Sequence, residues 1–443
     1  MARPKPLSGF PEFLPDERIV EQTVLDTLRE TFELHGFGNI ETRAVEPLAQ
    51  LSRKGEITKE VYVVRRLHAD EADQDELGLH FDLTVPLARW VLEHSGALQF
   101  PFRRYQIQKV WRGERPQEGR YREFTQADID IIGRGELAAH HDVEVPLVML
   151  EALERLHERI GLPPVLMHVN NRKLSEGFYR GLGVTDTPGV LQIVDKYDRI
   201  GAQATAQLLV DELGLDAGVA ERCVELATIR SDDTGFVDRV RALGVADELL
   251  DEGLAELVTL LEEANRRVPG RLCADLSIAR GMDYYTGCVY ETELVGFESM
   301  GSISSGGRYD SLASDGRNSH PGVGISLGVT RLLGPLLARG QFVVSRPVPT
   351  CVLVAVDSEE TRDRALDVAA VLRGRGIPTE VAPRADKYGK QIRYADRRGI
   401  PFVWFGPRVG EIKDIRSGDQ QPADAADWTP EEVDLHPCVL PAE

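Results

Sequence analysis

The sequence predicts a protein of mixed helices and strands, with a long helical segment in its middle and a separate α/β domain at its carboxyl end. Strand-like runs alternate with helical stretches up to about residue 160 and return after about 270, whereas residues 170–265 carry almost only helical spacing. After a break at 339–349, short apolar strands and helices alternate regularly. A chain of 443 residues is long enough for two to three domains.

The elements of the first part follow from local signals. Residues 16–35 form an amphipathic stripe between Asp16, which suits a helix cap, and Gly36, which ends a helix. Period-two alternation and β-branched residues predict the strands that follow. In chain order we expect strands at 61–65, 79–84, 103–112 and 123–132, a helix at 141–160, strands at 273–294 and 301–306, and a strand that leads into a helix at 322–337.

The residues beyond the break predict a βαβαβ unit with a parallel or mixed sheet. The expected order is a strand at 350–356, a helix at 358–373, a strand at 378–382, a helix at 385–398 and a strand at 401–406. From about residue 420 the chain has proline and acidic residues without periodicity, so we expect this tail to be partly loose.

Composition excludes several kinds of protein. The N-terminus has no apolar core of signal-peptide length and no stretch approaches the ~18 apolar residues of a membrane span, so we expect a soluble cytoplasmic protein. The five cysteines never stand as CxxC and the pair His140-His141 has no further ligand at metal spacing, so we expect neither disulfides nor a metal site. The net charge is −20, yet residues 103–122 and 384–398 are basic islands. Such islands suit selective contact with an anionic ligand better than coating of DNA.

The most informative segment is the predicted hairpin over 103–132. Period-two alternation places the polar side chains of each strand on one face of the sheet. These are Arg104, Gln106, Gln108 and Arg112 on the first strand, and Gln126, Asp128 and Asp130 on the second. A face with arginines beside carboxylates is costly unless it binds something charged, although a solvated, salt-bridged hairpin is the alternative.

A second cluster lies in 277–293, where Arg280 precedes the pair Tyr284-Tyr285, and the glycine-rich SSGGRYDSL follows. Arginine suits a phosphate because its guanidinium is planar and permanently charged. Glycines let a backbone approach a ligand. The alternative is a bulged strand with packed tyrosines.

Two further segments have an equally plain structural interpretation. In LHFDLTVPLARW, Asp82 and Thr84 project from one face of a strand end and could hold an ammonium group, or they could form a helix cap. In PGVGISLGVTRLLG, a glycine-rich strand leads into a helix with Arg331, which could be a surface arginine on a closely packed helix. The phosphate loop GxxxxGK[ST] does not occur in the sequence, so any ATP site must use another device.

Taken together, these segments resemble the histidyl-tRNA synthetases among the class II aminoacyl-tRNA synthetases. RGERPQEGRYREFTQ looks like motif 2 of that class and GVGISLGVTRL like motif 3, with a weak motif 1 around Pro47. ARGMDYYTGCVYE and SGGRYD are similar to histidine-specific signatures, and DLTVP and DKYDRIG fit the same family. The resemblance covers about 5–416 in order, and Met282 replaces the commoner leucine.

The resemblance implies a catalytic core with a mostly antiparallel sheet flanked by helices, a helical insertion and an α/β anticodon-binding domain. The catalytic domain would span 1–340, with the insertion at about 170–265, and the anticodon-binding domain 346–443. It further implies a homodimeric, ATP-dependent, AMP-forming ligase that uses Mg²⁺. Its partners would be histidine, ATP and histidine tRNA, without DNA or a membrane.

The resemblance also implies roles for particular residues. Arg112 and Arg280 would be catalytic: Arg112 would hold the α-phosphate and the substrate carboxylate, and Arg280 would stabilise the same phosphate from the other side. Arg331 would contact the γ-phosphate, and Arg120 would be a further ATP contact.

For histidine, two groups of contacts are implied. Asp82, Thr84 and Gln126 would hold the α-ammonium, and Asp130 and Tyr285 the imidazole nitrogens, with Tyr284 nearby. In the C-terminal domain, Lys390, Arg393 and Arg397 stand at helical spacing and could meet tRNA phosphates, with plain solvation as the alternative.

Two rival interpretations follow from the same residues. The first is a regulatory paralogue, like the synthetase-like subunit of the first histidine-biosynthesis enzyme. Such proteins generally lack the C-terminal domain and the catalytic arginines. The second is an RNA-binding or scaffold protein, which would not require Asp82, Gln126 and Asp130 beside a GMDYY segment.

Overall fold

The computed structural model describes residues 5–52, 60–68, 76–278 and 284–440. It divides into two units. The first comprises Met1–Pro11, Leu25–Glu158 and Leu162–Pro335, and the second comprises Glu12–Val24, Arg159–Gly161 and Leu336–Glu443.

The first unit is built on a nine-stranded sheet in the described residues, with the order β1-β5-β6-β12-β11-β10-β7-β9-β8. The strands are β1 (Gly38–Asn39), β5 (Phe102–Trp111), β6 (Glu123–Ile132), β7 (Val165–Asn171), β8 (Arg230–Ser231), β9 (Leu272–Asp275), β10 (Cys288–Leu294), β11 (Ser304–Ser314) and β12 (Ser319–Gly328). Only β1–β5 and β7–β9 pair in parallel, among these described strands. The prediction of a mostly antiparallel sheet is therefore confirmed.

The hairpin of β5 and β6 has almost the predicted bounds. Ala127, Ile129 and Ile131 are fully buried, as the alternation predicts for the apolar side of β6. Most of the polar side of this hairpin is buried as well, which alternation alone does not predict. Its buried residues are Arg104, Gln106, Gln126, Asp128 and Asp130, whereas Gln108 and Arg112 are half-buried.

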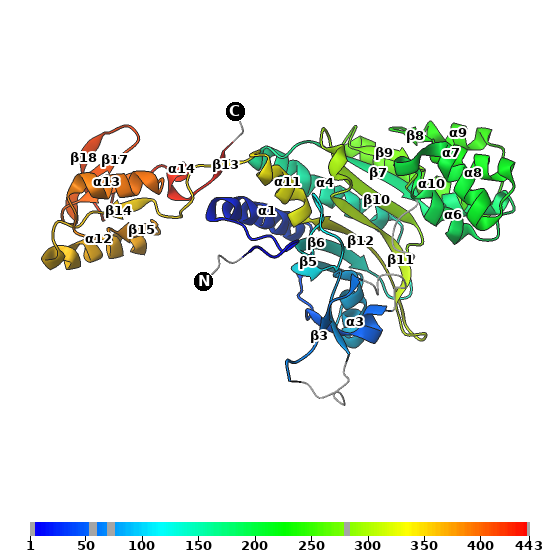
Figure 1. Cartoon of the computed structure of the whole chain (residues 1–443), viewed down its shortest axis with the longest axis horizontal. Coiled ribbons are helices and arrows are strands. Elements are labelled where there is room, and N and C mark those ends of the chain that lie inside the picture. The colour runs from blue at the N-terminus through cyan, green and yellow to red at the C-terminus, as the bar shows by residue number, and fades with distance from the viewer. Residues whose placement is uncertain (1–4, 53–59, 69–75, 279–283, 441–443) are drawn as a thin grey trace. The chain divides into compact units, whose positions relative to one another are not determined.

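Helices flank this sheet and, together with the short strand β8, form the segment between β7 and β9 (Figure 1). Those of that segment, whose residues are all described, are α5 (Arg172–Gly181), α6 (Thr187–Val194), α7 (Tyr197–Leu213), α8 (Ala217–Ala227), α9 (Phe236–Ala242) and α10 (Glu248–Arg267). The others are α1 (Pro15–Leu34), α3 (Thr84–His94), α4 (His140–Ile160) and α11 (Val329–Ala338), with a 3-10 turn at Glu298–Met300. Helices α6 to α10 gather beside the sheet edge that ends in β8.

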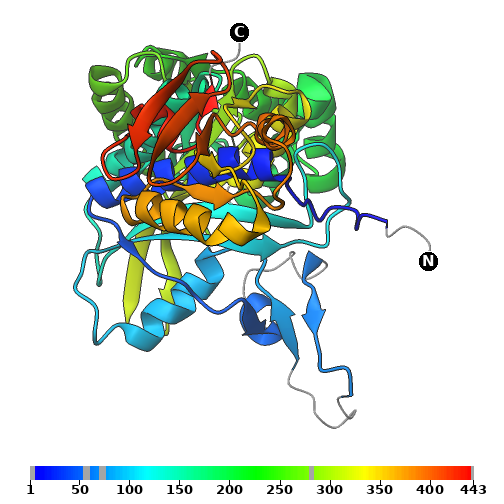
Figure 2. The ribbon, with the colours of Figure 1, turned by 90° about the vertical axis from the view of Figure 1, so that its left-hand side faces the viewer.

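A small second sheet projects from the nine-stranded one in both ribbon views (Figures 1 and 2). It has the order β2-β4-β3 and carries helix α2. Its elements are β2 (Val45–Pro47), α2 (Leu48–Leu51), β3 (Val63–Val64) and β4 (Leu77–Leu79).

The predicted strand at 79–84 is wrong beyond its first residue. Strand β4 ends at Leu79, and Thr84 is already the first residue of α3. The Oδ1 atom of Asp82 accepts the backbone N–H of Val85 at 3.0 Å, which satisfies a free donor in the first turn of the helix. The cap alternative therefore describes Asp82 better than a strand end does. The predicted strand at 273–294 is two strands, β9 and β10.

The C-terminal unit has a mixed five-stranded sheet in the order β15-β14-β16-β17-β18, so a parallel or mixed sheet was the right prediction. Its elements are β14 (Val352–Val354), a 3-10 turn at Glu359–Thr361, α12 (Arg362–Gly374), β15 (Thr379–Val381), α13 (Tyr388–Arg397), β16 (Phe402–Phe405), β17 (Val409–Asp414) and β18 (Gln420–Asp424). They are joined by α14 (Glu432–Leu435) and by β13 (Val343–Val344), which pairs with β19 (Val439–Leu440).

The expectation of a loose tail after 420 is wrong for residues 420–440. Strand β18 pairs with β17, and the ring of Trp428 packs 5.2 Å from Phe402 and 6.3 Å from Trp404. The tail thus completes the domain core despite its irregular polarity pattern. Among the described helices, none combines the length and apolar character that a bilayer crossing requires.

Candidate active site

Three neighbouring strands carry a buried polar lattice. On β5 and β6, Arg104 lies opposite Asp130 and Gln106 opposite Asp128. On β12, Ser326 lies opposite Asp128. Because paired residues point to the same face, these side chains meet on one side of the sheet. Arg104 is 0% exposed, so a full guanidinium is buried there.

The carboxylate of Asp130 is held from two directions. Its Oδ2 lies 2.6 Å from Nη2 of Arg104, and its Oδ1 accepts the hydroxyl of Tyr309 at 2.6 Å. The carboxylate of Asp128 is less well compensated: burial raises its pKa to about 7, although Arg104 opposes that shift. One guanidinium thus serves two buried carboxylates, and the lattice can carry a net negative charge.

The tyrosine pair joins the predicted histidine contacts. The hydroxyl of Tyr284 shares hydrogen bonds with Tyr285 and Thr84, and Asp82 and Asp130 lie within its electrostatic reach. Burial, followed by those two carboxylates, raises the pKa of Tyr284, so its hydroxyl keeps its proton. The structure therefore brings together five residues predicted from three separate segments.

Glycines in β12 make room for these side chains. A Cβ atom on Gly324 would lie 2.0 Å from Oδ1 of Asp130, and one on Gly322 would lie 2.5 Å from the ring of Tyr309. These two glycines therefore serve the polar pocket. The alternative prediction, close packing of a strand on a helix, does not account for them.

A cluster of arginines lies next to this pocket. Nε of Arg112 donates to the backbone oxygen of Phe81, the residue before Asp82, at 3.0 Å. The nearest carboxylate oxygens of Glu114 are 3.9 Å from Arg112 and 3.8 Å from Arg120. Two guanidinium groups thus share one acidic neighbour at long range.

Arg331 of α11 completes the cluster. Its Nη2 donates to the backbone oxygen of Met300 at 2.9 Å, and its Nε is buried without a hydrogen-bond partner in the described residues. Burial lowers its pKa, and the positive charges of Arg120 and Arg112 lower it further. A half-buried arginine beside two others makes a candidate anion site, and it is less exposed than the alternative of a surface arginine predicts. Arg280 lies outside the described residues.

Four residues of the pocket had no predicted role: Arg104, Asp128, Tyr309 and Ser326. The alternation argument placed the first two on the polar face, and Tyr309 and Ser326 stood inside quoted motifs. Their contacts depend on strand register, which connects residues up to about 200 positions apart and leaves no local signal.

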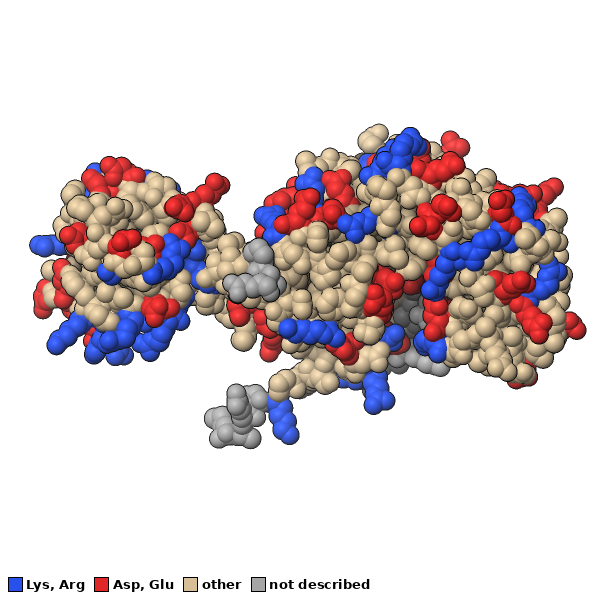
Figure 3. Space-filling model, turned by 90° about the horizontal axis from the view of Figure 1, so that it is seen from above, with Lys and Arg blue, Asp and Glu red and all other residues tan. Residues whose placement is uncertain are grey.

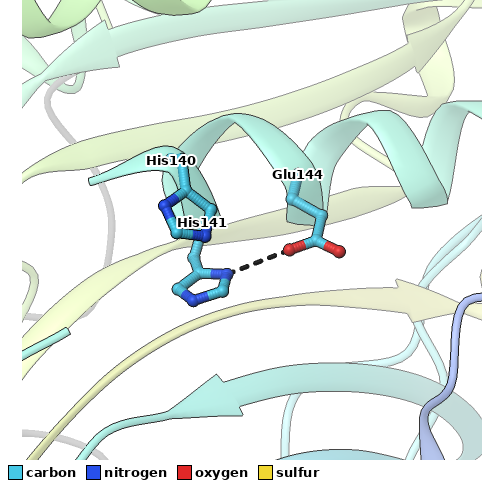
Figure 4. A group of neighbouring side chains, drawn as sticks. All are labelled: His140, His141 and Glu144. Atoms are coloured by element: carbon cyan, nitrogen blue, oxygen red, sulfur yellow. Dashed lines mark hydrogen bonds and ion pairs between the residues drawn. The ribbon is translucent and has the colours of Figure 1, made fainter. Parts of the chain in front are cut away.

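A separate cavity of about 1200 Å³ lies between α4 and the end of α10, and none of the predicted site residues that the structure describes lines it. At its edge, His140, His141 and Glu144 form a cluster with the geometry of a metal site (Figure 4). However, Glu144 is already held by Arg103, with its Oε1 at 2.5 Å. The cluster also lies at the positive N-terminal end of α4, which disfavours a cation. We therefore assign no metal to it.

The C-terminal unit carries a second anionic-ligand candidate on α13. A cavity of about 400 Å³ is lined by Arg384, Lys390, Arg393 and Arg397. Lysine and arginine side chains gather along one edge of this unit (Figure 3). In the described residues, the only carboxylate lining this cavity is Asp386, which pairs with Lys390 at 3.2 Å. The cavity is therefore predominantly basic.

Comparison with known proteins gives consistent matches over the whole chain. The family model described as histidyl-tRNA synthetase matches residues 9–332, and that described as anticodon binding domain matches 350–406. The histidine–tRNA ligase of Cutibacterium acnes is 65% identical, with 99% of both chains covered, and that of Micrococcus luteus is 59% identical over 100% of both. The crystal structure of histidyl-tRNA synthetase from Nostoc sp. PCC 7120 is 33% identical with a TM-score of 0.83, covering 96% of this chain and 98% of that one. The chain belongs to the histidyl-tRNA synthetase family.

Proposed function

We propose that the chain joins histidine to tRNA in two steps. Histidine carboxylate attacks the α-phosphate of ATP, which gives histidyl-adenylate and pyrophosphate, and the terminal ribose hydroxyl of tRNA then displaces AMP. The observation that carries this proposal is the adjacency of two subsites. Arg112 of the arginine cluster bonds to the backbone beside Asp82, so an anion site directly adjoins the carboxylate pocket.

ATP would occupy the arginine cluster. Phosphoryl transfer depends mostly on positioning and on neutralising negative charge, which fixed guanidinium groups provide. Arg112 would face the α-phosphate, Arg331 the γ-phosphate, and Arg120 a further phosphate oxygen, with Arg280 assigned by resemblance alone. Mg²⁺ would supply additional charge neutralisation on the triphosphate. Glu114 is a carboxylate within this cluster and offers the oxygen ligands that Mg²⁺ prefers.

Histidine would occupy the carboxylate pocket. We assign Asp130 and Tyr285 to the ring nitrogens and Asp82, Thr84 and Gln126 to the α-ammonium, with Tyr284 between them. A pocket built to accept ring N–H donors leaves its own groups unpaired when an apolar analogue binds. Such a site can discriminate by about 10⁴-fold without editing.

Replacing Gly324 with alanine tests this pocket without removing a polar group. The new Cβ would collide with the Asp130 carboxylate, so we expect KM for histidine to rise at least tenfold while KM for ATP stays within twofold. Steady-state ATP–pyrophosphate exchange measures both constants. Gly38→Ala is the matched control, because its Cβ would meet nothing closer than 3.7 Å. Equal changes in both constants would indicate general distortion of the sheet.

The basic cavity on α13 would bind tRNA phosphates. Replacing Lys390, Arg393 and Arg397 with glutamine should raise KM for tRNA in aminoacylation and leave ATP–pyrophosphate exchange unchanged. Each lost phosphate contact should lower the slope of log affinity against log salt by about 1. A filter-binding titration at several salt concentrations measures that slope. A slope identical to that of the wild type would mean that these side chains are only solvated.

The remaining assignments belong to the same proposal. We place the catalytic domain at 1–340, with the helical insertion at about 170–265, and the anticodon-binding domain at 346–443. We further propose a homodimer that acts in the cytoplasm. The presence of Arg112, Arg331 and a C-terminal α/β unit argues against a regulatory paralogue, and the carboxylate pocket argues against a scaffold.

ATP–pyrophosphate exchange with each of the twenty amino acids tests the proposed function. We expect exchange with histidine and background rates with the others. A chain that exchanges with none would fit the regulatory or scaffold interpretation.

A further inference from the structure

One buried residue of the polar lattice has no part in the function proposed above. Asp128 is 2% exposed and lies on β6 between Gln126 and Asp130, two residues from each. Burying a carboxylate costs free energy unless neighbouring groups stabilise its charge or form hydrogen bonds with it. The contacts of the Asp128 side chain show which neighbouring groups it orients.

The first contact fixes a hydroxyl group. Ser326 donates its Oγ proton to Oδ1 of Asp128. Oδ1 of Asp128 is the acceptor of this hydrogen bond, so the hydroxyl proton of Ser326 points to Asp128. Nη2 of Arg104 lies 3.9 Å from the other oxygen, Oδ2, and favours the ionised form.

The second contact fixes an amide. Because the proton of Ser326 points to Asp128, its oxygen is left to accept, and it accepts Nε2 of Gln126. The two ends of a glutamine amide have almost the same shape, so neighbouring groups decide which end faces which way. Because Nε2 donates to Ser326, Oε1 is the end of the Gln126 amide that is left to accept a hydrogen bond from a ligand. It is buried and has no hydrogen-bond partner in the described residues.

We propose that Asp128 is a positioning residue that acts through Ser326 to turn the carbonyl end of Gln126 toward the substrate ammonium. The relay selects a ligand that donates at this position, and it rests on the assignment of Gln126 to the histidine α-ammonium in the proposed function. An amide with the opposite orientation would present N–H groups to a cation and repel it.

Ser326→Ala tests the relay, because it removes both hydrogen bonds and leaves all the charges in place. A hydrogen bond to a charged group corresponds to roughly tenfold to a hundredfold in affinity. We expect KM for histidine to rise by that factor in ATP–pyrophosphate exchange, with KM for ATP unchanged. Asp128→Ala, which removes the acceptor of the Ser326 proton, should have a similar effect, and the double variant should be no worse than the poorer single variant, because both changes break one relay.

Two inhibitors separate positioning from general loosening of the pocket. Histidinol carries the ammonium and the ring, whereas 3-(imidazol-4-yl)propionate carries the ring without the ammonium. In Ser326→Ala, the inhibition constant of histidinol should rise by the same factor as KM for histidine, and that of the propionate should stay within twofold. Ser304→Ala is the matched control, since Ser304 is a buried serine on the adjacent strand outside the relay. It should change neither constant.

Equal weakening of both inhibitors in Ser326→Ala contradicts the relay, as does an unchanged KM for histidine in a variant that melts like the wild type. Additive effects of the two substitutions also contradict it. In each of these cases the wild type still exchanges with histidine, so the proposed function stands. Wild-type protein without histidine-dependent exchange contradicts the proposed function and the relay together.

Discussion

Replacing Arg112 with alanine is expected to slow histidine-dependent ATP–pyrophosphate exchange by about 10²- to 10³-fold. Removing one preorganised charge stabiliser costs about 3 to 4 kcal/mol of transition-state stabilisation. Arg112 fits that description because its Nε is fixed by the backbone of Phe81 and its guanidinium lies 5.2 Å from the ring centre of Phe124. The effect should appear mainly in kcat, because negative charge develops during the attack on phosphorus.

Two variants make this prediction specific. Arg112→Lys keeps the charge but loses the planar fork, so it should recover only part of the rate. Arg134→Ala removes an exposed arginine beyond the end of β6, at the other end of the hairpin, and should leave the rate unchanged. Exchange within threefold of the wild-type rate in Arg112→Ala would remove Arg112 from the phosphate site.

Replacing Asp130 with alanine is expected to have the second-largest effect, on both substrate binding and stability. The ring of histidine would lose its charged acceptor, so KM for histidine should rise by about 10²-fold or more. Arg104 would be left buried without its closest partner at 2.6 Å, and breaking such a pair costs about 3–5 kcal/mol of folding free energy.

Asp130→Asn separates the two effects. The amide keeps the shape and an acceptor oxygen, so the loss of stability should be smaller, whereas the affinity for histidine should still fall. KM for histidine from exchange kinetics and the free energy of unfolding from urea titration measure the two quantities. An unchanged KM in Asp130→Asn with a lowered unfolding free energy would make Asp130 a purely structural residue.

The sequence predicted elements whose signal is local. The hairpin of β5 and β6 has a strict two-residue alternation, and its predicted bounds are correct to within one residue. The C-terminal alternation of strands and helices was predicted equally well, because each element is short, apolar and bounded by turn residues. By contrast, the strand preference of LHFDL led to a predicted strand that reached Thr84. The capping contact of Asp82 overrides that preference, and Thr84 begins α3.

The candidate site was predictable as a set of segments and not as a set of contacts. Period-two alternation placed Arg104 and Asp128 on the polar face but gave them no role. Their partners, Asp130 and Ser326, are set by the register of β5, β6 and β12. Glycines such as Gly324 looked like packing residues because the side chain that needs their space comes from another strand. Strand register depends on the tertiary fold, so the local pattern of one sequence does not predict which residues of different strands lie opposite each other.

A crystal structure of the chain with ATP and histidinol tests the central claim most directly, since histidinol lacks the carboxylate that reacts. The account predicts the triphosphate between the guanidinium groups of Arg112 and Arg331, and the imidazole ring within hydrogen-bond distance of Asp130. Triphosphate bound elsewhere, with those two arginines turned to separate partners, would contradict it.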